Sequence, residues 1–321
     1  MKFFTFLTII GTAIAAPLVA TPRLHPTSLS RRAAASNSNP SFTDIWQLAL
    51  HVEHLEIGLY FTAFARFSQQ DFINAGFDAF YYQTLRDILH EHQFQATSIR
   101  RNQLYVEDSV VQACSYSFSF TDVKSFISLS ATLEGFATSF YLSLIHSVVA
   151  APDPDTSLEF ALTIAGSTAA IDAKHVALQR LSLKQNVTDT NFFPQLGLNE
   201  SYTFAKSFAK SCPKTGYQLP FTPLPTLIPN VTQVVPGQIV DFYSPLPIDN
   251  SLNGLFIFDF YDIASTILTT GDKPGHFHTR IPSDIVSPVS QMYFVVTKYD
   301  ENDYLDESTV LAGPAVFQVL P

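Results

Sequence analysis

The chain has 321 residues, of which 46% are hydrophobic, so it can form one large domain or two ordinary domains with buried cores. Its formal net charge of −10 argues against nucleic acid and anionic membrane surfaces as partners. No internal stretch reaches the roughly 18 uninterrupted apolar residues of a membrane-spanning helix, so we expect no membrane span.

The first 20 residues have the pattern of a signal peptide. Lys2 provides the positive start, an apolar run follows over residues 3–10, and small residues suited to cleavage come next. We therefore expect a secreted, extracellular protein. The next segment, 21–40, carries the dibasic pair Arg31-Arg32 and is predicted to be a propeptide or a disordered segment, whether or not the pair is cleaved.

Glycosylation and cysteine pairing fit the same compartment. Three N-x-[ST] sequons predict glycosylation at Asn186, Asn199 and Asn230. An oxidising environment favours a disulfide between the two cysteines, Cys114 and Cys212, and two buried free thiols are the alternative.

Residues 41–185 have the periodicity of long helices. Apolar residues recur at intervals of three and four in four segments: 43–67, 78–104, 122–148 and 155–183. Asp44, Asp122 and Asp155 stand near the starts of three of them, as expected for helix N-termini. Four long helices in this length predict a four-helix bundle.

The character of the sequence changes after a predicted linker over residues 186–215. Five prolines cluster between residues 213 and 229. Short runs rich in Val, Phe, Tyr and Thr follow at 238–243, 255–260, 292–297 and 315–320. Such runs between turn residues predict a small antiparallel β domain over 216–321, with a sandwich-like arrangement.

An internal repeat places acidic residues at matching points of the helical region. Glu53 and Glu134 lie 81 residues apart, and each is followed 38 residues later by a second carboxylate, Glu91 and Asp172. The spacing assigns one carboxylate to each of the four helices. Four converging carboxylates are costly to bury unless protons or metal ions neutralise them. The repeat therefore predicts a centre for two divalent metals.

Histidines complete only one half of this pattern. His175 follows Asp172 by three residues, so both side chains lie on one helix face and can share a metal. The other half has Phe94 where the repeat predicts histidine, and His92 is expected to point about 100° away from the face of Glu91. Glu56 is expected outside the ligand set. The predicted metal ligands are Glu53, Glu91, Glu134, Asp172 and His175.

At these residues the chain resembles a secreted fungal ferritin-like family that includes proteins linked to stress response and late sexual development. The matching stretches are 51–60, 89–91, 114–118, 133–135, 172–175 and 312–316. The resemblance implies a mainly α chain, with a ferritin-like four-helix bundle over 41–185 followed by the small antiparallel β domain. It also implies a di-iron-type centre at the predicted ligands, with Asp172 in place of the usual glutamate.

Two functions follow from these patterns. In the first, a secreted ferritin-like protein binds iron or manganese at a degenerate di-metal carboxylate site and has at most a weak oxidase or peroxide-handling activity. In the second, the metal is lost, and the bundle serves as the scaffold of an extracellular or wall-associated structural or developmental protein. The retained acids favour the first, and Phe94 favours the second. The oligomeric state is not predicted.

Overall fold

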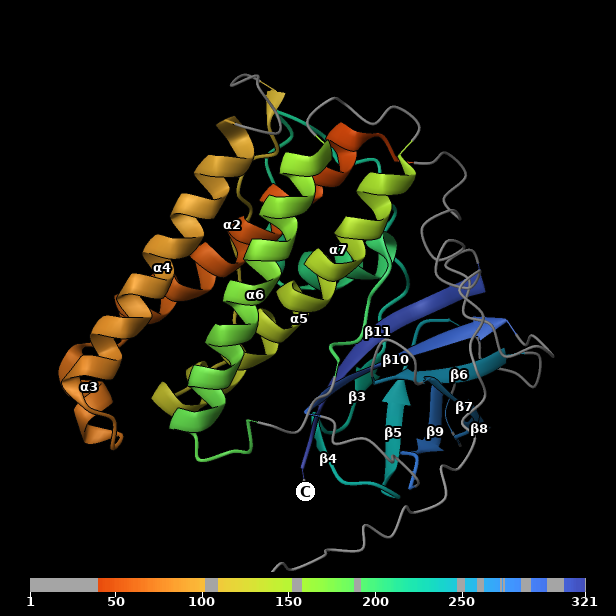
Figure 1. Cartoon of the computed structure of the whole chain (residues 1–321). Coiled ribbons are helices and arrows are strands. Elements are labelled where there is room, and N and C mark those ends of the chain that lie inside the picture. Colours follow the sequence, from red (N-terminus) through yellow and green to blue (C-terminus); the bar gives the residue numbers. More distant parts are fainter. Residues whose placement is uncertain are drawn as a thin grey trace, which may run out of the picture.

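The computed structural model describes residues 40–101, 109–151, 158–187, 192–246, 252–258, 263–271, 273, 275–283, 290–298 and 309–320. The expected signal peptide and the dibasic pair lie outside these ranges. The described chain consists of a helical half followed by a β half that packs against it (Figure 1).

Four long helices form the bundle, which confirms the predicted fold class. They are α2 (Phe42–Arg66), α4 (Ala79–Ile99), α5 (Val123–Ala150) and α6 (Leu158–Ser182). A short helix that the sequence analysis did not predict, α3 (Gln69–Asn74), lies between α2 and α4.

Local sequence sets the helix starts. The Ser41 hydroxyl accepts a hydrogen bond from the backbone N–H of Asp44 at 3.1 Å, and the Asp44 carboxylate accepts the backbone N–H of Ser41 at 2.8 Å. Asp122 caps α5 by accepting the N–H of Ser125 at 2.8 Å. These side chains satisfy backbone donors that the first helical turn leaves free.

Helix α5 is the most deeply buried element of the bundle. Within the described part of the chain, it is the only helix that is long and apolar enough to cross a membrane. However, 72% of its most apolar 18-residue stretch is buried inside the protein. Its apolar character is therefore that of a core helix, because it packs against α6, α2 and α7.

The β half contains two sheets. The larger has the strand order β4 (Gln233–Val234), β11 (Val310–Val319), β10 (Gln291–Lys298), β6 (Leu252–Ile257) and β7 (Ile263–Ile267). The smaller has the order β3 (Ile228–Pro229), β5 (Ile239–Tyr243), β9 (His276–Arg280) and β8 (Thr269–Thr270). Neighbouring strands are antiparallel, except that β4 is parallel to β11.

The larger sheet is the middle layer of the molecule. On β10, Phe294 and Val296 belong to the core between the two sheets, where Phe294 contacts Phe242 of β5 with 4.8 Å between ring centroids. Tyr293 and Val295, which point to the opposite face of the strand, belong to the core shared with the bundle. The β half is thus a two-sheet sandwich, and helices cover the face of the larger sheet that points away from the smaller sheet.

Polar contacts fix the sheet to the bundle near α5. The Tyr293 hydroxyl lies 3.0 Å from the Ser139 hydroxyl, and Gln318 of β11 accepts a hydrogen bond from Arg180 of α6 at 2.9 Å. A Cβ atom at Gly135 would lie 2.8 Å from the Gln291 side chain, so α5 and β10 approach closely there. This contact fixes the position of the helix segment that carries Glu134.

The segment predicted as a linker contains a helix that the sequence analysis did not find. Helix α7 (Leu198–Ser207) packs against α2, α5 and β11. Strand β2 (Ala209–Ser211) follows α7 and pairs with β1 (Ser115–Tyr116). Cys114 and Cys212 form a disulfide beside this pair. The segment therefore connects the two halves as a packed element.

Candidate metal centre

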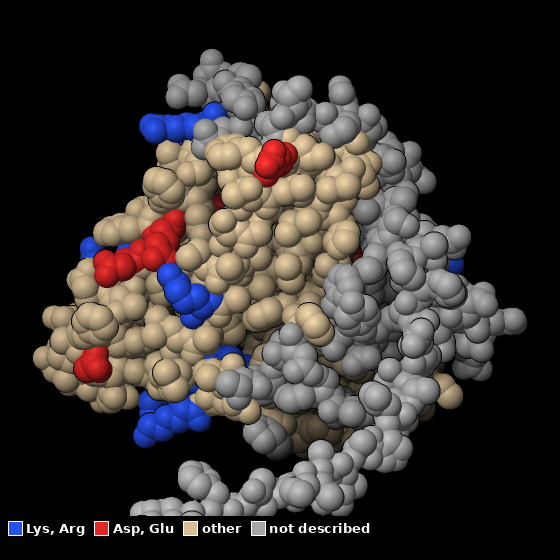
Figure 2. Space-filling model, viewed as in Figure 1, with Lys and Arg blue, Asp and Glu red and all other residues tan. Residues whose placement is uncertain are grey.

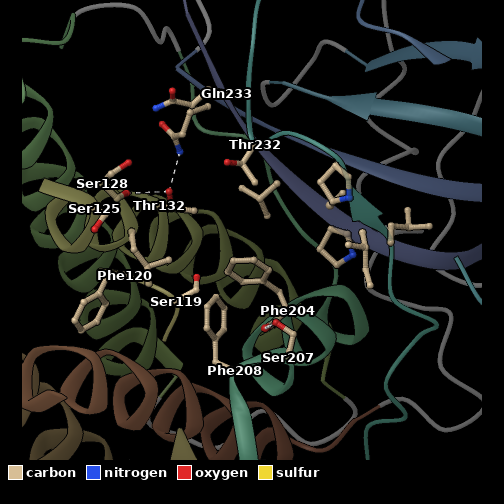
Figure 3. A pocket seen from close by; sticks show the side chains of 18 of the residues that line it. Ser119, Phe120, Ser125, Ser128, Thr132, Phe204, Ser207, Phe208, Thr232 and Gln233 are labelled. Carbon is tan, nitrogen blue, oxygen red and sulfur yellow. Dashed lines mark hydrogen bonds between the residues drawn. The ribbon is translucent and has the colours of Figure 1, made fainter. Parts of the chain in front are cut away.

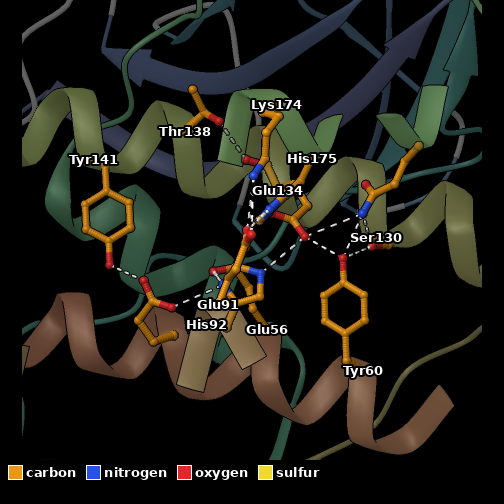
Figure 4. A network of polar contacts seen from close by, with 12 residues as sticks. Glu56, Tyr60, Glu91, His92, Ser130, Glu134, Thr138, Tyr141, Lys174 and His175 are labelled. Atoms are coloured by element: carbon orange, nitrogen blue, oxygen red, sulfur yellow. Dashed lines mark hydrogen bonds and ion pairs between the residues drawn. The ribbon is translucent and has the colours of Figure 1, made fainter. Parts of the chain in front are cut away.

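A cluster of acidic residues and histidines occupies the middle of the bundle (Figure 4). All four long helices contribute, and each side chain is at most 1% exposed. The members are Glu53 and Glu56 from α2, His92 from α4, Glu134 from α5, and Asp172 and His175 from α6.

Glu134 is the hub of this cluster. Its Oε1 atom accepts a hydrogen bond from the Tyr60 hydroxyl at 2.5 Å and lies 3.3 Å from Nε2 of His92. Its Oε2 atom lies 3.0 Å from Nδ1 of His175. The two imidazole rings are neighbours, with 5.5 Å between their centroids. Three helices thus bring their polar atoms together at one carboxylate.

The two halves of the sequence repeat exchange hydrogen bonds. Tyr60 of α2 donates to Glu134 of α5, and Tyr141 of α5 donates to Glu53 of α2. Each tyrosine lies seven residues after the glutamate of its own helix and binds the glutamate of the other. The tyrosines therefore hold both central carboxylates in fixed orientations.

His92 lies inside the cluster, so the expectation that it points away from the site is wrong. Its Nδ1 atom is 3.2 Å from Glu53 and 3.6 Å from Glu56. Glu91, the predicted ligand next to it, lies at the rim with a side chain 42% exposed, where its Oε2 atom is 2.7 Å from Nε2 of His175 and 3.3 Å from Lys174.

The rotation of α4 explains this difference. Its inward face carries Leu85, Leu89, Ala96 and Ile99, and His92 is in phase with them. Glu91 is one position out of phase. Phe94 lies on the outer surface with 73% exposure and has no part in the site. The apolar stripe, which was visible in the sequence, was the signal that identified His92.

Burial and charge shift the pKa values within the cluster. Burial raises the pKa of Asp172, and nearby Glu134 and Glu53 raise it further. Burial also raises the pKa of Glu56. Although burial opposes it, His92 and His175 hold the pKa of Glu134 well below its usual range. The pKa of His92 is raised by Glu56 and Glu134 against the effect of burial.

These residues fit a metal ion. Both carboxylate oxygens of Asp172 and of Glu56 are buried without a hydrogen-bond partner in the described structure. Buried carboxylates without hydrogen bonds require protons or a cation. Ligand atoms of His92, Glu134 and His175 lie within 4.8 Å of one another, as do those of Glu53, Glu56 and His92. Carboxylate oxygens and imidazole nitrogens suit manganese and iron.

The centre is internal, since each of its side chains is at most 1% exposed. On the face seen in Figure 2, acidic and basic side chains are scattered over a mostly uncharged surface. None of the three predicted glycosylation sites belongs to the buried cluster. Asn186 and Asn230 are exposed, while Asn199 is partly buried in the first turn of α7 and Ser201 of its sequon is fully buried.

A cleft separates the bundle from the β half on one side. It has a volume of about 900 Å³ and lies between α5, α7 and the strands β3, β4 and β11. Hydroxyl and amide groups of Ser128, Thr132 and Gln233 lie on one side, and the rings of Phe204 and Phe208 lie on another (Figure 3). Asp122 and Lys124 are the only charged residues of its described lining.

The fold and the site define a four-helix bundle with a buried carboxylate–histidine centre. Comparison with known proteins agrees, because residues 41–185 match the family described as the ferritin-like domain. The helical half is thus a ferritin-like domain, and the β half lies outside the matched residues. No curated protein sequence matches the chain.

Proposed function

We propose that the ferritin-like domain binds iron or manganese at its buried centre, in a protein that is secreted. The buried carboxylates of Glu56 and Asp172, which have no hydrogen-bond partner in the part of the chain that the structure describes, are the observation that carries the proposal. Export is supported by the signal-peptide pattern and by the disulfide between Cys114 and Cys212. The resemblance noted above suggests a role in stress response or development.

The chain's own residues prepare the centre for a cation. Tyr60 and Tyr141 orient the carboxylates of Glu134 and Glu53, and the surrounding core excludes water. At the rim, Lys174 and His175 hold Glu91. A bound iron or manganese ion would supply one-electron redox chemistry, so we expect at most a weak oxidase or peroxide-handling activity.

Elemental analysis of the purified secreted protein tests metal binding. We expect iron or manganese in near-stoichiometric amount in the wild type and none in a double variant with Glu134→Ala and Asp172→Ala. Glu159→Ala, which removes an exposed carboxylate from the same helix as Asp172, is the control and should retain the metal. Absence of metal from the wild type after loading with ferrous iron would refute the proposal.

The cleft supports a second function, in which the protein associates with a cell wall. Neutral hydroxyl and amide groups together with the rings of Phe204 and Phe208 suit a neutral polysaccharide, which offers hydroxyls and apolar ring faces. Binding to insoluble glucan and chitin should weaken in Phe204→Ala and Phe208→Ala variants. Phe94→Ala, which alters an exposed ring elsewhere, is the control. Equal binding by all variants would count against this function.

A further inference from the structure

We infer that the centre holds a single metal ion bound by His92, Glu134 and His175, in place of the two ions that four converging carboxylates would take. The inference rests on the proposed function, since it specifies how the ferritin-like domain binds metal. It follows from which atom of each imidazole faces which carboxylate.

His175 presents one nitrogen to the centre. Its Nε2 atom is 2.7 Å from Oε2 of Glu91, and Nζ of Lys174 lies 3.3 Å from the same oxygen. A neutral imidazole carries one N–H and one lone pair. If the N–H points to Glu91, the lone pair of Nδ1 faces Glu134, whose Oε2 atom is 3.0 Å away.

His92 has the same arrangement from the opposite side. Its Nδ1 atom lies 3.2 Å from Glu53, and Tyr141 donates a hydrogen bond to the other oxygen of that carboxylate. An N–H at this position leaves the lone pair of Nε2 facing Glu134 at 3.3 Å. Each histidine is thus turned toward Glu134 by an acidic partner behind it.

The result is three acceptor atoms from three helices around one point. Lone pairs of two imidazoles and a carboxylate repel one another unless protons or a metal cation lie between them, and one metal ion can accept all three. Metal-binding histidines characteristically donate their other N–H to a carboxylate, which fixes the ring and its tautomer. Two histidines and one carboxylate are the ligand set of mononuclear non-haem ferrous centres. Asp172, whose two oxygens have no hydrogen-bond partner among the described residues, adds a further buried carboxylate nearby but is not one of the three ligands.

A second ion has no independent ligand set in the described residues. The other candidate group, Glu53 with Glu56 and His92, depends on the same histidine. One neutral imidazole offers one lone pair, so His92 serves one group or the other. The repeat does not supply a replacement, because Phe94, which corresponds to His175, lies on the surface.

The number of bound ions tests the inference. The full-length protein is loaded anaerobically with ferrous iron or with Mn²⁺, passed over a desalting column, and analysed for metal per chain. We expect one ion per chain and an uncoupled Mn²⁺ signal in electron paramagnetic resonance. Two ions per chain with spin coupling would overturn the inference and leave the proposed function intact, whereas no bound ion would overturn the proposed function itself.

Variants separate ligands from orienting residues. His92→Gln should lose the ion. Glu53→Gln, which removes the negative charge behind His92, should retain one ion with affinity lowered about 10- to 100-fold. His90→Gln, an exposed neighbour on α4, is the control and should bind as the wild type does. Loss of the ion in Glu53→Gln together with retention in His92→Gln would overturn the assignment. If His92→Gln fails to fold, the wild-type stoichiometry and resonance spectrum decide.

Discussion

The two helix pairs of the bundle share the spacing of their acidic residues and tyrosines but differ in where their histidines lie. Glu53 and Glu134 occupy equivalent positions, and so do their tyrosines. However, His175 of the second pair is buried at the centre, while its counterpart Phe94 is 73% exposed. The first pair instead contributes His92 from a position where the second has Ala173. The two helix pairs thus carry carboxylates at matching positions but place their histidines differently, which makes the site asymmetric.

Substituting the equivalent residues His175 and Phe94 should give the largest difference in stability between the two helix pairs. His175→Ala leaves Glu134 buried without one of its two imidazole partners, which should lower the free energy of unfolding by about 3–5 kcal/mol. Phe94→Ala, on the surface, should change it by less than about 0.5 kcal/mol. Urea denaturation of both metal-free variants measures the difference, and equal losses would show that the pairs are not distinguished in this way.

Metal loading should stabilise the protein next most strongly. At a free metal concentration 100 times the Kd, binding to the folded state alone adds about 2.7 kcal/mol to the free energy of unfolding.

The stability of the metal-free protein should also depend on pH. The pKa values of Glu56, Asp172 and His92 are raised in the folded state, so it binds more protons than the unfolded chain above their usual pKa values. Its stability should therefore fall as the pH rises from 7 to 9.

The pH interval is chosen to isolate these groups. Burial lowers the pKa values of His51 and His54 to about 4, so these two histidines make stability fall as the pH drops from 6.5 toward 4. Above pH 7 they contribute little. Thermal unfolding between pH 7 and pH 9 should show a shallower decline in Glu56→Gln than in the exposed control Glu159→Gln. The same slope in both would exclude Glu56 as a source of the effect.

The sequence repeat predicted much of the centre and the difference between its two halves, but it did not predict that His92 lies inside. Glu53, Glu134, Asp172 and His175 were identified from intervals alone, and all four lie buried in the cluster. Interval arithmetic assumes that equivalent helices have the same rotation, and α4 does not follow this assumption. Its rotation is set by the apolar residues that pack into the core, which place His92 inward.

Outside the centre, long or strongly patterned elements were predictable and short ones were not. The four long helices and the strands β5, β6, β10 and β11 are near their predicted positions. Helix α7 has ten residues and is helical through its contacts with α2, α5 and β11, which a local pattern cannot reveal. Likewise, the two-sided burial of β10 depends on the bundle that covers it.

Tyr60 and Tyr141, each of which donates a hydrogen bond to the glutamate of the other helix, should give the smallest difference in stability between the two helix pairs. Tyr141→Phe removes the hydroxyl that donates to one oxygen of the buried Glu53, and no other described group is hydrogen-bonded to that oxygen. We expect a loss of about 1–2 kcal/mol in unfolding free energy. Tyr60→Phe should cost less, because Glu134 keeps both imidazole partners and Gln179 lies 3.5 Å from the same oxygen.

Chemical denaturation of the two metal-free tyrosine variants, with Tyr82→Phe as a partly buried control on α4, measures this difference. A larger loss for Tyr60→Phe would mean that its contacts with Ser130 and Gln179 outweigh those of the carboxylate. The expected order instead follows from how many partners each glutamate retains. Glu134 has alternatives because both histidines turn toward it, whereas Glu53 depends on one tyrosine and one imidazole. The inward position of His92 therefore explains both the unequal roles of the two tyrosines and the ligand set that we propose.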